Sequence, residues 1–269
     1  SWAQLTRDAA NTAMNQTNDG QALLITAWQG VSAADYLVDI GVGPSASPTT
    51  VQTIVEKLYF NASGSTMRGQ QIYLPLETQA GQALWARASS NVANATMIMS
   101  YNQISYGFRP PRTYQKCVTY NMPGTVLNPA VNVGATNSTA VPIAFSDPGM
   151  TVSGTKVFAN ITTVASPATT TIQYPVSMAM FAFVPGNPGA SQATEKWYVD
   201  IRRSTGSAII IPDIVVSQEA NSDRISQGYF GPVPLSIPVG ETIQAGVCVS
   251  AASATVTIRE LGVIMYAFS

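Results

Sequence analysis

The chain repeats itself, and this repeat constrains its fold more than any other feature. Residues 36–40 (YLVDI) recur as 197–201 (WYVDI), so that Asp39 matches Asp200 at an offset of 161 residues. Residues 74–86 then match 233–245 and align Gly81 with Gly240, and 90–99 match 249–258, both at an offset of 159. Ordered matches with a small drift are expected when one module is duplicated and a loop between strands then loses residues. The chain is therefore predicted to hold two related domains.

Each copy has the sequence pattern of β-strands. Apolar residues occupy alternate positions in 84–89 and 243–249, as one face of a half-buried strand requires. Residues 169–174 and 255–261 are rich in β-branched residues and are also predicted to be strands. Short strands between Gly, Pro and Asn clusters are typical of sandwiches and barrels. The predicted fold is all-β, with two tandem, related antiparallel β-sandwich (jelly-roll-like) domains.

The predicted domain boundary lies in a proline-containing segment. Residues 106–114 (YGFRPPRTY) include two consecutive prolines, which favour an extended, semi-rigid connector. We therefore predict an N-terminal sandwich over 1–108, a connector over 109–122 and a C-terminal sandwich over 123–269.

Composition excludes several classes of partner. Charged residues make up 10% of the chain, the formal net charge is −1, and no run of Lys or Arg is present. Such a surface predicts no nucleic-acid binding. No apolar run approaches the roughly 20 residues that cross a bilayer, which predicts no membrane insertion. Cys117 and Cys248 are too few for a disulfide framework; free buried thiols are favoured, and a single bridge stays open.

The chain contains no histidine, which removes the commonest general base and the commonest zinc ligand. We expect no catalytic, cofactor-binding or metal site and no enzyme activity. Paired carboxylates are the remaining route to hydrolysis, as in glycosidases. Asp39 and Asp200 recur at one place in both copies, which favours a structural role. Glu219 and Asp223 are interpreted as part of a solvated hairpin loop.

Aromatic side chains are the remaining candidates for a functional surface. Tyr106, Phe108 and Tyr114 crowd the connector, and Tyr229 and Phe230 are interpreted as aromatics at a loop tip. Flat rings stack on sugars or anchor partner proteins. We name these five residues as candidate surface contacts, although packing between the two sandwiches is the favoured role for the connector group.

Two segments carry a resemblance to a known family. Residues 34–43 (ADYLVDIGVG) followed by 72–90 (IYLPLETQAGQALWARASS) resemble a recurrent β-rich module of tailed-phage virion proteins. The second copy departs from this pattern at Arg202-Arg203, where the first has Gly41-Val42.

The resemblance implies an accessory structural protein of the virion that decorates or stabilises the capsid, head fibre or tail. Its partner would then be a major capsid protein or another virion protein. A neutral all-β chain suits repeated subunit contacts under closed symmetry, and a homo-oligomer is expected, with a trimer favoured. The alternative is a carbohydrate-binding adhesin or receptor-binding protein that recognises a cell-surface glycan.

Overall fold

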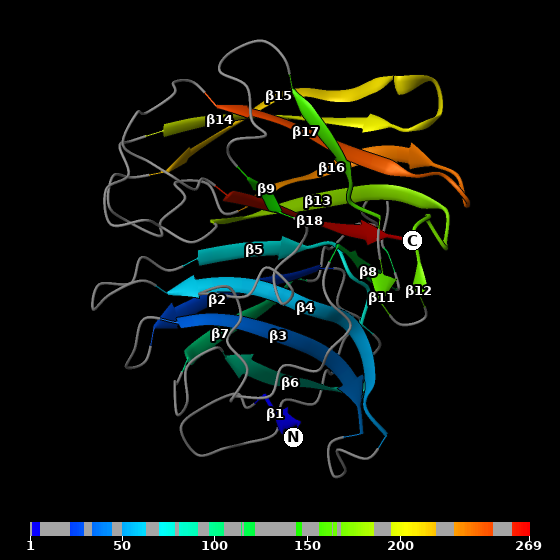
Figure 1. Cartoon of the computed structure of the whole chain (residues 1–269). Coiled ribbons are helices and arrows are strands. Elements are labelled where there is room, and N and C mark those ends of the chain that lie inside the picture. Colours follow the sequence, from blue (N-terminus) through cyan, green and yellow to red (C-terminus); the bar gives the residue numbers. More distant parts are fainter. Residues whose placement is uncertain are drawn as a thin grey trace. The chain divides into compact units, whose positions relative to one another are not determined.

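The computed structural model describes most of the strands of both copies (Figure 1). The described residues are 2–5, 22–29, 34–44, 50–62, 70–78, 81–90, 97–104, 114, 116–121, 144–146, 156–162, 164–165, 168–185, 195–218, 229–249 and 260–269. No helix among them is long and apolar enough to span a bilayer.

The chain divides into two compact units. Unit 1 comprises Ser1–Val118 with Leu127–Pro129 and Phe268–Ser269, and unit 2 comprises Thr119–Val126 with Ala130–Ala267. The predicted connector over 109–122 stays a prediction, because the structure describes only Tyr114 and residues 116–121 of it.

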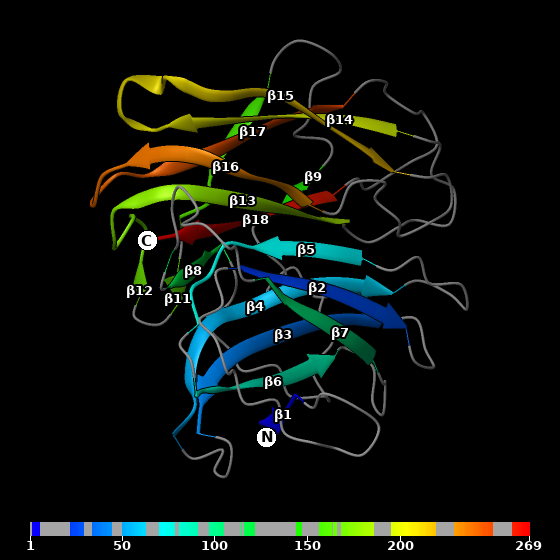
Figure 2. The same cartoon turned by 180° about the vertical axis from the view of Figure 1, so that it is seen from behind.

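Unit 1 contains two antiparallel sheets, seen from opposite sides in Figures 1 and 2. One sheet has the order β1-β6-β3-β4 and the other the order β5-β2-β7. The strands are β1 (Ala3–Gln4), β2 (Ala22–Gln29), β3 (Ala34–Gly43), β4 (Gln52–Ala62), β5 (Gln70–Leu74), β6 (Ala83–Ser90) and β7 (Met97–Ile104).

Unit 2 repeats this plan with additional strands. Its sheets have the orders β10-β17-β14-β15 and β16-β13-β18-β8, with β9 also on β18 and a separate β11-β12 pair. The elements are β8 (Cys117–Tyr120), β9 (Ala144–Ser146), β10 (Val157–Asn160), β11 (Val164–Ala165), β12 (Ala168–Thr169), β13 (Val176–Pro185), β14 (Glu195–Arg203), the 3-10 turn η2 (Thr205–Ser207), β15 (Ile209–Gln218), β16 (Tyr229–Ile237), β17 (Ile243–Val249) and β18 (Glu260–Phe268).

The strand order is that of a jelly roll. If β8, β10 and β13 to β18 are numbered one to eight along the chain, the two sheets read 1-8-3-6 and 2-7-4-5. The seven strands that the structure describes in unit 1 take positions two to eight of the same diagram, because β1-β6-β3-β4 corresponds to 2-7-4-5 and β7-β2-β5 to 8-3-6. The predicted fold class, all-β with two related sandwich domains, is confirmed.

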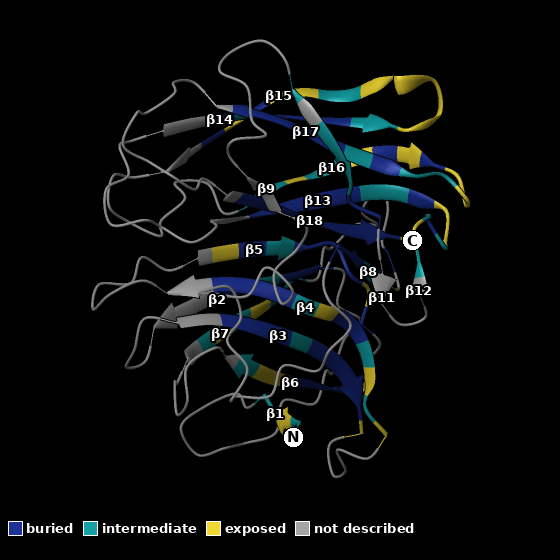
Figure 3. Cartoon of the chain, viewed as in Figure 1, coloured by how far each residue is buried: buried dark blue, intermediate teal, exposed yellow. Residues whose placement is uncertain are grey.

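The two units also share their core pattern. The described residues of β3 are mostly buried (Figure 3). Tyr36, Val38 and Ile40 share one side of β3, and in β14 the buried residues Trp197, Val199 and Ile201 take the matching places. Alternation with a period of two places one side of each strand in the sandwich interior. The opposite side of these strands carries the polar residues of the repeat.

One predicted strand differs from the structure. Residues 169–174 were predicted to be extended, but the strand there ends at Thr169 and residues 170–171 and 174 form bends. The backbone of Ile172 instead bonds to a turn: Ile172 N donates to Glu241 O at 2.8 Å, and Gly240 N donates to Ile172 O at 2.9 Å. These long-range bonds outweigh the β-propensity of the threonines.

The turns before β6 and β17 give a test of the duplication. Gly81 (φ 81°) and Gly240 (φ 85°) both adopt the left-handed conformation, and an added Cβ would meet no atom within 4 Å at either. Replacement by Ala should therefore cost only the backbone strain, about 1 kcal/mol of unfolding free energy in each copy. Chemical denaturation measures this loss. Gly81→Asn and Gly240→Asn should lose less, since Asn tolerates this conformation; unchanged stability in both Ala variants would contradict the assignment.

Candidate functional site

The best-defined polar cluster surrounds the repeated aspartate, and it begins with a backbone irregularity. The β3–β4 register shifts between Val38 and Ile40, and the β14–β15 register shifts between Val199 and Ile201. The residue at each shift has positive φ, 56° at Lys57 and 46° at Asp213. Its N–H donates to the aspartate opposite at 2.7 Å, from Lys57 to Asp39 Oδ1 and from Asp213 to Asp200 Oδ1. In both units the aspartate side chain therefore holds a strained β-bulge.

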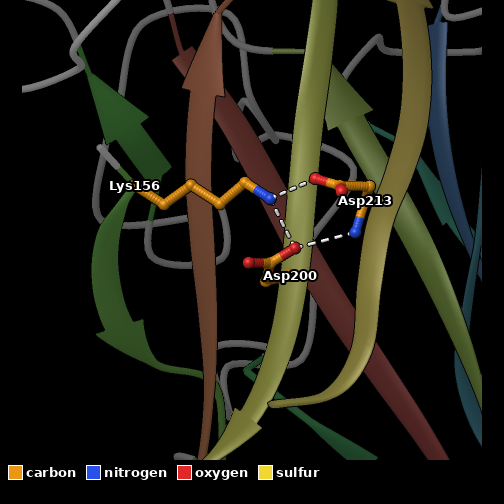
Figure 4. A network of polar contacts seen from close by, with 3 residues as sticks. All are labelled: Lys156, Asp200 and Asp213. Carbon is orange, nitrogen blue, oxygen red and sulfur yellow. Dashed lines mark hydrogen bonds and ion pairs between the residues drawn. The ribbon is translucent and has the colours of Figure 1, made fainter. Parts of the chain in front are cut away.

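Each aspartate has a cationic partner, but the two partners come from different strands. In unit 1, Arg87 Nε on β6 donates to Asp39 Oδ2 at 2.6 Å, directly across the sheet. The residue across from Asp200 is Gly246, which has no side chain. Lys156, just before β10, instead reaches across β17 and donates to Asp200 and Asp213 at 2.5 Å each (Figure 4). Both aspartates are therefore paired with a cation, but the cation comes from β6 in unit 1 and from the residue before β10 in unit 2.

An aromatic ring lies against an arginine in both clusters. The Arg87 guanidinium lies 4.6 Å from the centre of the Trp2 ring, and that of Arg202 lies 3.5 Å from the Phe158 ring. Pairing of Ala3 with Ala86 and of Ala159 with Ala245 shows that Trp2 and Phe158 occupy equivalent positions. Both contacts are cation–π interactions.

The arginine and a glycine have exchanged places between the units. Unit 1 has Gly41 on β3 and Arg87 on β6, whereas unit 2 has Arg202 on β14 and Gly246 on β17. A Cβ at Gly246 would overlap the Phe158 ring, and one at Gly41 would meet Val51 and the Trp2 ring. Arg202, where the second copy departs from the first, is thus one half of an exchange. The arginine moves to β14, and Gly246 on β17 leaves room for the Phe158 ring.

The electrostatics of the cluster favour charged lysine at position 156. Burial alone would lower the pKa of Lys156, but the hydrogen bonds and charges of Asp200 and Asp213 raise it above its ordinary value of 10.5. The pKa of Lys57 is lowered by burial, with Glu56 and Asp39 opposing the shift. The Lys156 ammonium bridges the Asp200 and Asp213 carboxylates.

The connector aromatics have separate outcomes. Tyr106 and Phe108 lie outside the described residues. Tyr114 is buried in unit 1, where it bridges to Leu76 and its ring lies 5.9 Å from that of Phe268. A residue enclosed in this way supplies core packing instead of a surface contact.

Tyr229 and Phe230 begin β16 and pair with Ala182 and Phe181 of β13. Both are half-buried, and the Tyr229 ring lies 6.3 Å from that of the buried Tyr266. Burial raises the pKa of Tyr229 well above its ordinary value, and Tyr266 raises it further. Their backbones are therefore part of a sheet, at the first two positions of β16, and their rings are partly covered by neighbouring residues.

The cysteines and the loop acids complete the list of predicted residues. Cys117 and Cys248 are free and buried, which confirms the favoured alternative, and burial raises the pKa of the Cys117 thiol. Glu219 and Asp223 lie outside the described residues. In the part of the chain that the structure describes, no three His, Cys, Asp or Glu side chains are grouped to hold a metal ion.

Comparisons with known proteins give weak likenesses and no family. No family model and no curated protein matches the sequence. The CBM22-1-CBM22-2 tandem domain of Paenibacillus barcinonensis Xyn10C aligns over 100% of this chain and 86% of its own, at 7% identity and a TM-score of 0.27. A chain in the structure of infectious bursal disease virus (Gx strain) aligns over 96% of this chain and 60% of its own length, at 10% identity and a TM-score of 0.25. The PBSX exported protein XepA aligns over 100% and 86%, at 8% identity and a TM-score of 0.19.

The raised pKa of Lys156 predicts a stability difference that depends on pH. A group whose pKa is raised by folding stabilises the protein fully below its unfolded value, here 10.5, and loses that contribution as the pH rises through the folded value. Lys156→Met should therefore reduce the unfolding free energy at neutral pH, and the gap to the parent should narrow above pH 10.5. Denaturant titrations across this range measure it. Arg87→Met is the control: its gap should stay constant, because arginine remains charged.

The two exchanged glycines should respond differently when the neighbouring aromatic ring is removed. Gly246→Ala should cost about 1–3 kcal/mol through overlap with Phe158, and adding Phe158→Ala should relieve most of that overlap. Gly41→Ala should be equally harmful, but Trp2→Ala should not relieve it, because Val51 and the Gln52 carbonyl at 2.9 Å remain in the way. Double-mutant cycles in urea test both pairs. Additive losses at Gly246 and Phe158 would refute the packing argument.

Proposed function

We propose that this chain is a non-catalytic structural virion protein that decorates or stabilises a phage particle through protein–protein contacts. It works as a homo-oligomer, with a trimer favoured, and its partner is a major capsid protein or another virion protein. Its place is the virion.

The observation that carries this proposal is the structural use of the repeated aspartate. Asp39 and Asp200 are the polar residues most clearly retained by the duplication, and both hold a bulge through a backbone N–H and a cation. In this duplicated module the shared polar residues stabilise the β-bulges of the module itself. Such a module is suited to hold a surface rigidly in place. Jelly rolls serve this purpose in viral capsids.

Surface chemistry supports the same role. The net charge of −1 and the 10% content of charged residues leave little electrostatic repulsion between copies. Interfaces between repeated subunits are depleted of charge in their centres, so a neutral jelly roll fits them.

The proposal predicts an oligomer that travels with particles. Size-exclusion chromatography with light scattering should give a mass about three times the 28.4 kDa of one chain. In a density gradient of tailed-phage particles from the host that carries this gene, the chain should sediment with the infectious fraction. A monomer at high concentration that is absent from purified particles would overturn the proposal.

A carbohydrate-binding adhesin is the second candidate, because jelly rolls also form lectin domains. The exposed ring of Tyr174 in unit 2 is the feature that favours it. A reproducible glycan-array signal that is lost in Tyr174→Ala would favour the adhesin over the structural protein.

A further inference from the structure

Three loops of unit 2 are joined into one surface at the same end of the sandwich. They are residues 170–175 before β13, 204–208 between β14 and β15, and 238–242 between β16 and β17, and together we call them the three-loop end. Ser204 N donates to Thr242 O at 2.9 Å, and Gly240 N donates to Ile172 O at 2.9 Å. Thr205 N also donates to Glu241 Oε1 at 3.3 Å. Because the loops are bonded to each other, this surface is ordered before any partner arrives.

This end displays apolar side chains to solvent. Tyr174 and Val239 lie in two of the loops and Ile209 directly follows the third, with 43%, 55% and 54% of their surfaces exposed. Among the described residues the one other large exposed apolar side chain is Val215, farther along β15. Because the three loops are bonded to each other, these side chains are displayed at one end of unit 2, and exposed apolar surface of this kind is a candidate for interaction.

The duplication shows that the fold does not require this exposure. Ile209 pairs with Arg202 on β14, and the matching pair in unit 1 is Thr53 with Gly41 on β3. The same sheet position therefore accepts a polar residue in the sister unit, where Thr53 is half-buried. The isoleucine is therefore a feature of unit 2 that the shared sandwich fold does not require.

Charge indicates what covers this end. Glu241 is the one charged residue within the three loops, and Arg203 adjoins them at the end of β14, where its guanidinium donates to Ser236 O at 2.5 Å. The surface therefore has one charge of each sign. When copies meet around a symmetry axis, identical groups approach each other, and a surface of one charge sign would repel itself. A neutral, apolar end is free of this penalty.

We propose that the three-loop end of unit 2 is the surface through which one copy of this chain binds another copy. The inference rests on the proposed function for the existence of the oligomer, and adds which face of the chain forms it. Ile209 and Val239 supply the buried apolar contact, and the exposed loop hydroxyls form its polar rim.

The test compares exposed apolar residues inside the three-loop end with one outside it. Ile209→Ser with Val239→Ser removes apolar surface from the three-loop end, and Val215→Ser removes it from β15 outside that end. Analytical ultracentrifugation should show self-association weakened by about tenfold or more in the double variant and unchanged in Val215→Ser. Far-ultraviolet circular dichroism should show the same β-sandwich spectrum in the parent and both variants, so that a loss of association is not caused by unfolding. The thermal transition of the double variant should fall with the lost association, since binding between native copies stabilises them.

The outcomes separate this inference from the proposed function. An oligomer that survives unchanged in the double variant would overturn the three-loop end as its interface and leave the virion role intact. A parent chain that stays monomeric would overturn the oligomer itself. If the double variant instead loses a glycan-array signal or particle binding while the parent is monomeric, the surface serves another partner and the assignment to a second copy is wrong.

Discussion

The hydrogen bond from a left-handed backbone N–H to an aspartate carboxylate governs the construction of both units. A non-glycine residue with positive φ is costly, and a bulge leaves an N–H without its ladder partner. The carboxylates of Asp39 and Asp200 accept these bonds at 2.7 Å and so make the bulge an ordered part of the sheet. The bulge fixes the register of the strand pair, and the register decides which side chains enter the sandwich. Core packing therefore depends on this polar contact on the outer side of the strand.

The two units show which parts of this device are constrained and which are free. The carboxylate and the N–H are retained, whereas the bulge residue is Lys57 in one unit and Asp213 in the other. An aspartate at the bulge adds a second negative charge beside Asp200, and Lys156 bridges the pair. A carboxylate that is shielded from water needs a compensating charge, but that charge can come from any strand within reach. Duplication followed by exchange of arginine and glycine produces such a change.

The sequence predicted the repeat, the sandwich class and the structural role of the aspartates, because these follow from local patterns and from alignment of the chain with itself. It did not predict the bulges, since their residues share no type. Lys156 was missed too, although the missing side chain at Gly246, where the first copy has Arg87, was a signal that another cation had to be found. Tyr114 was named as a candidate surface contact with packing as the favoured role, and it is buried, with its ring 5.9 Å from that of Phe268, more than a hundred residues later. Long-range contacts of this kind leave no trace in local composition.

The same constraint explains where a duplicated sandwich can acquire new function. Positions on β3 and β14 are held by the core on one side and by the aspartate cluster on the other, so a change there needs a compensating change. Loop ends are less constrained, because most of the bonds between them join backbone atoms and leave the exposed side chains free to vary. Residue 209 illustrates the difference: it is the first residue of its strand, and its counterpart is Thr53. Divergence between the two units should therefore gather at the ends of the sandwich, where a neutral apolar surface can form while the sheets stay unchanged.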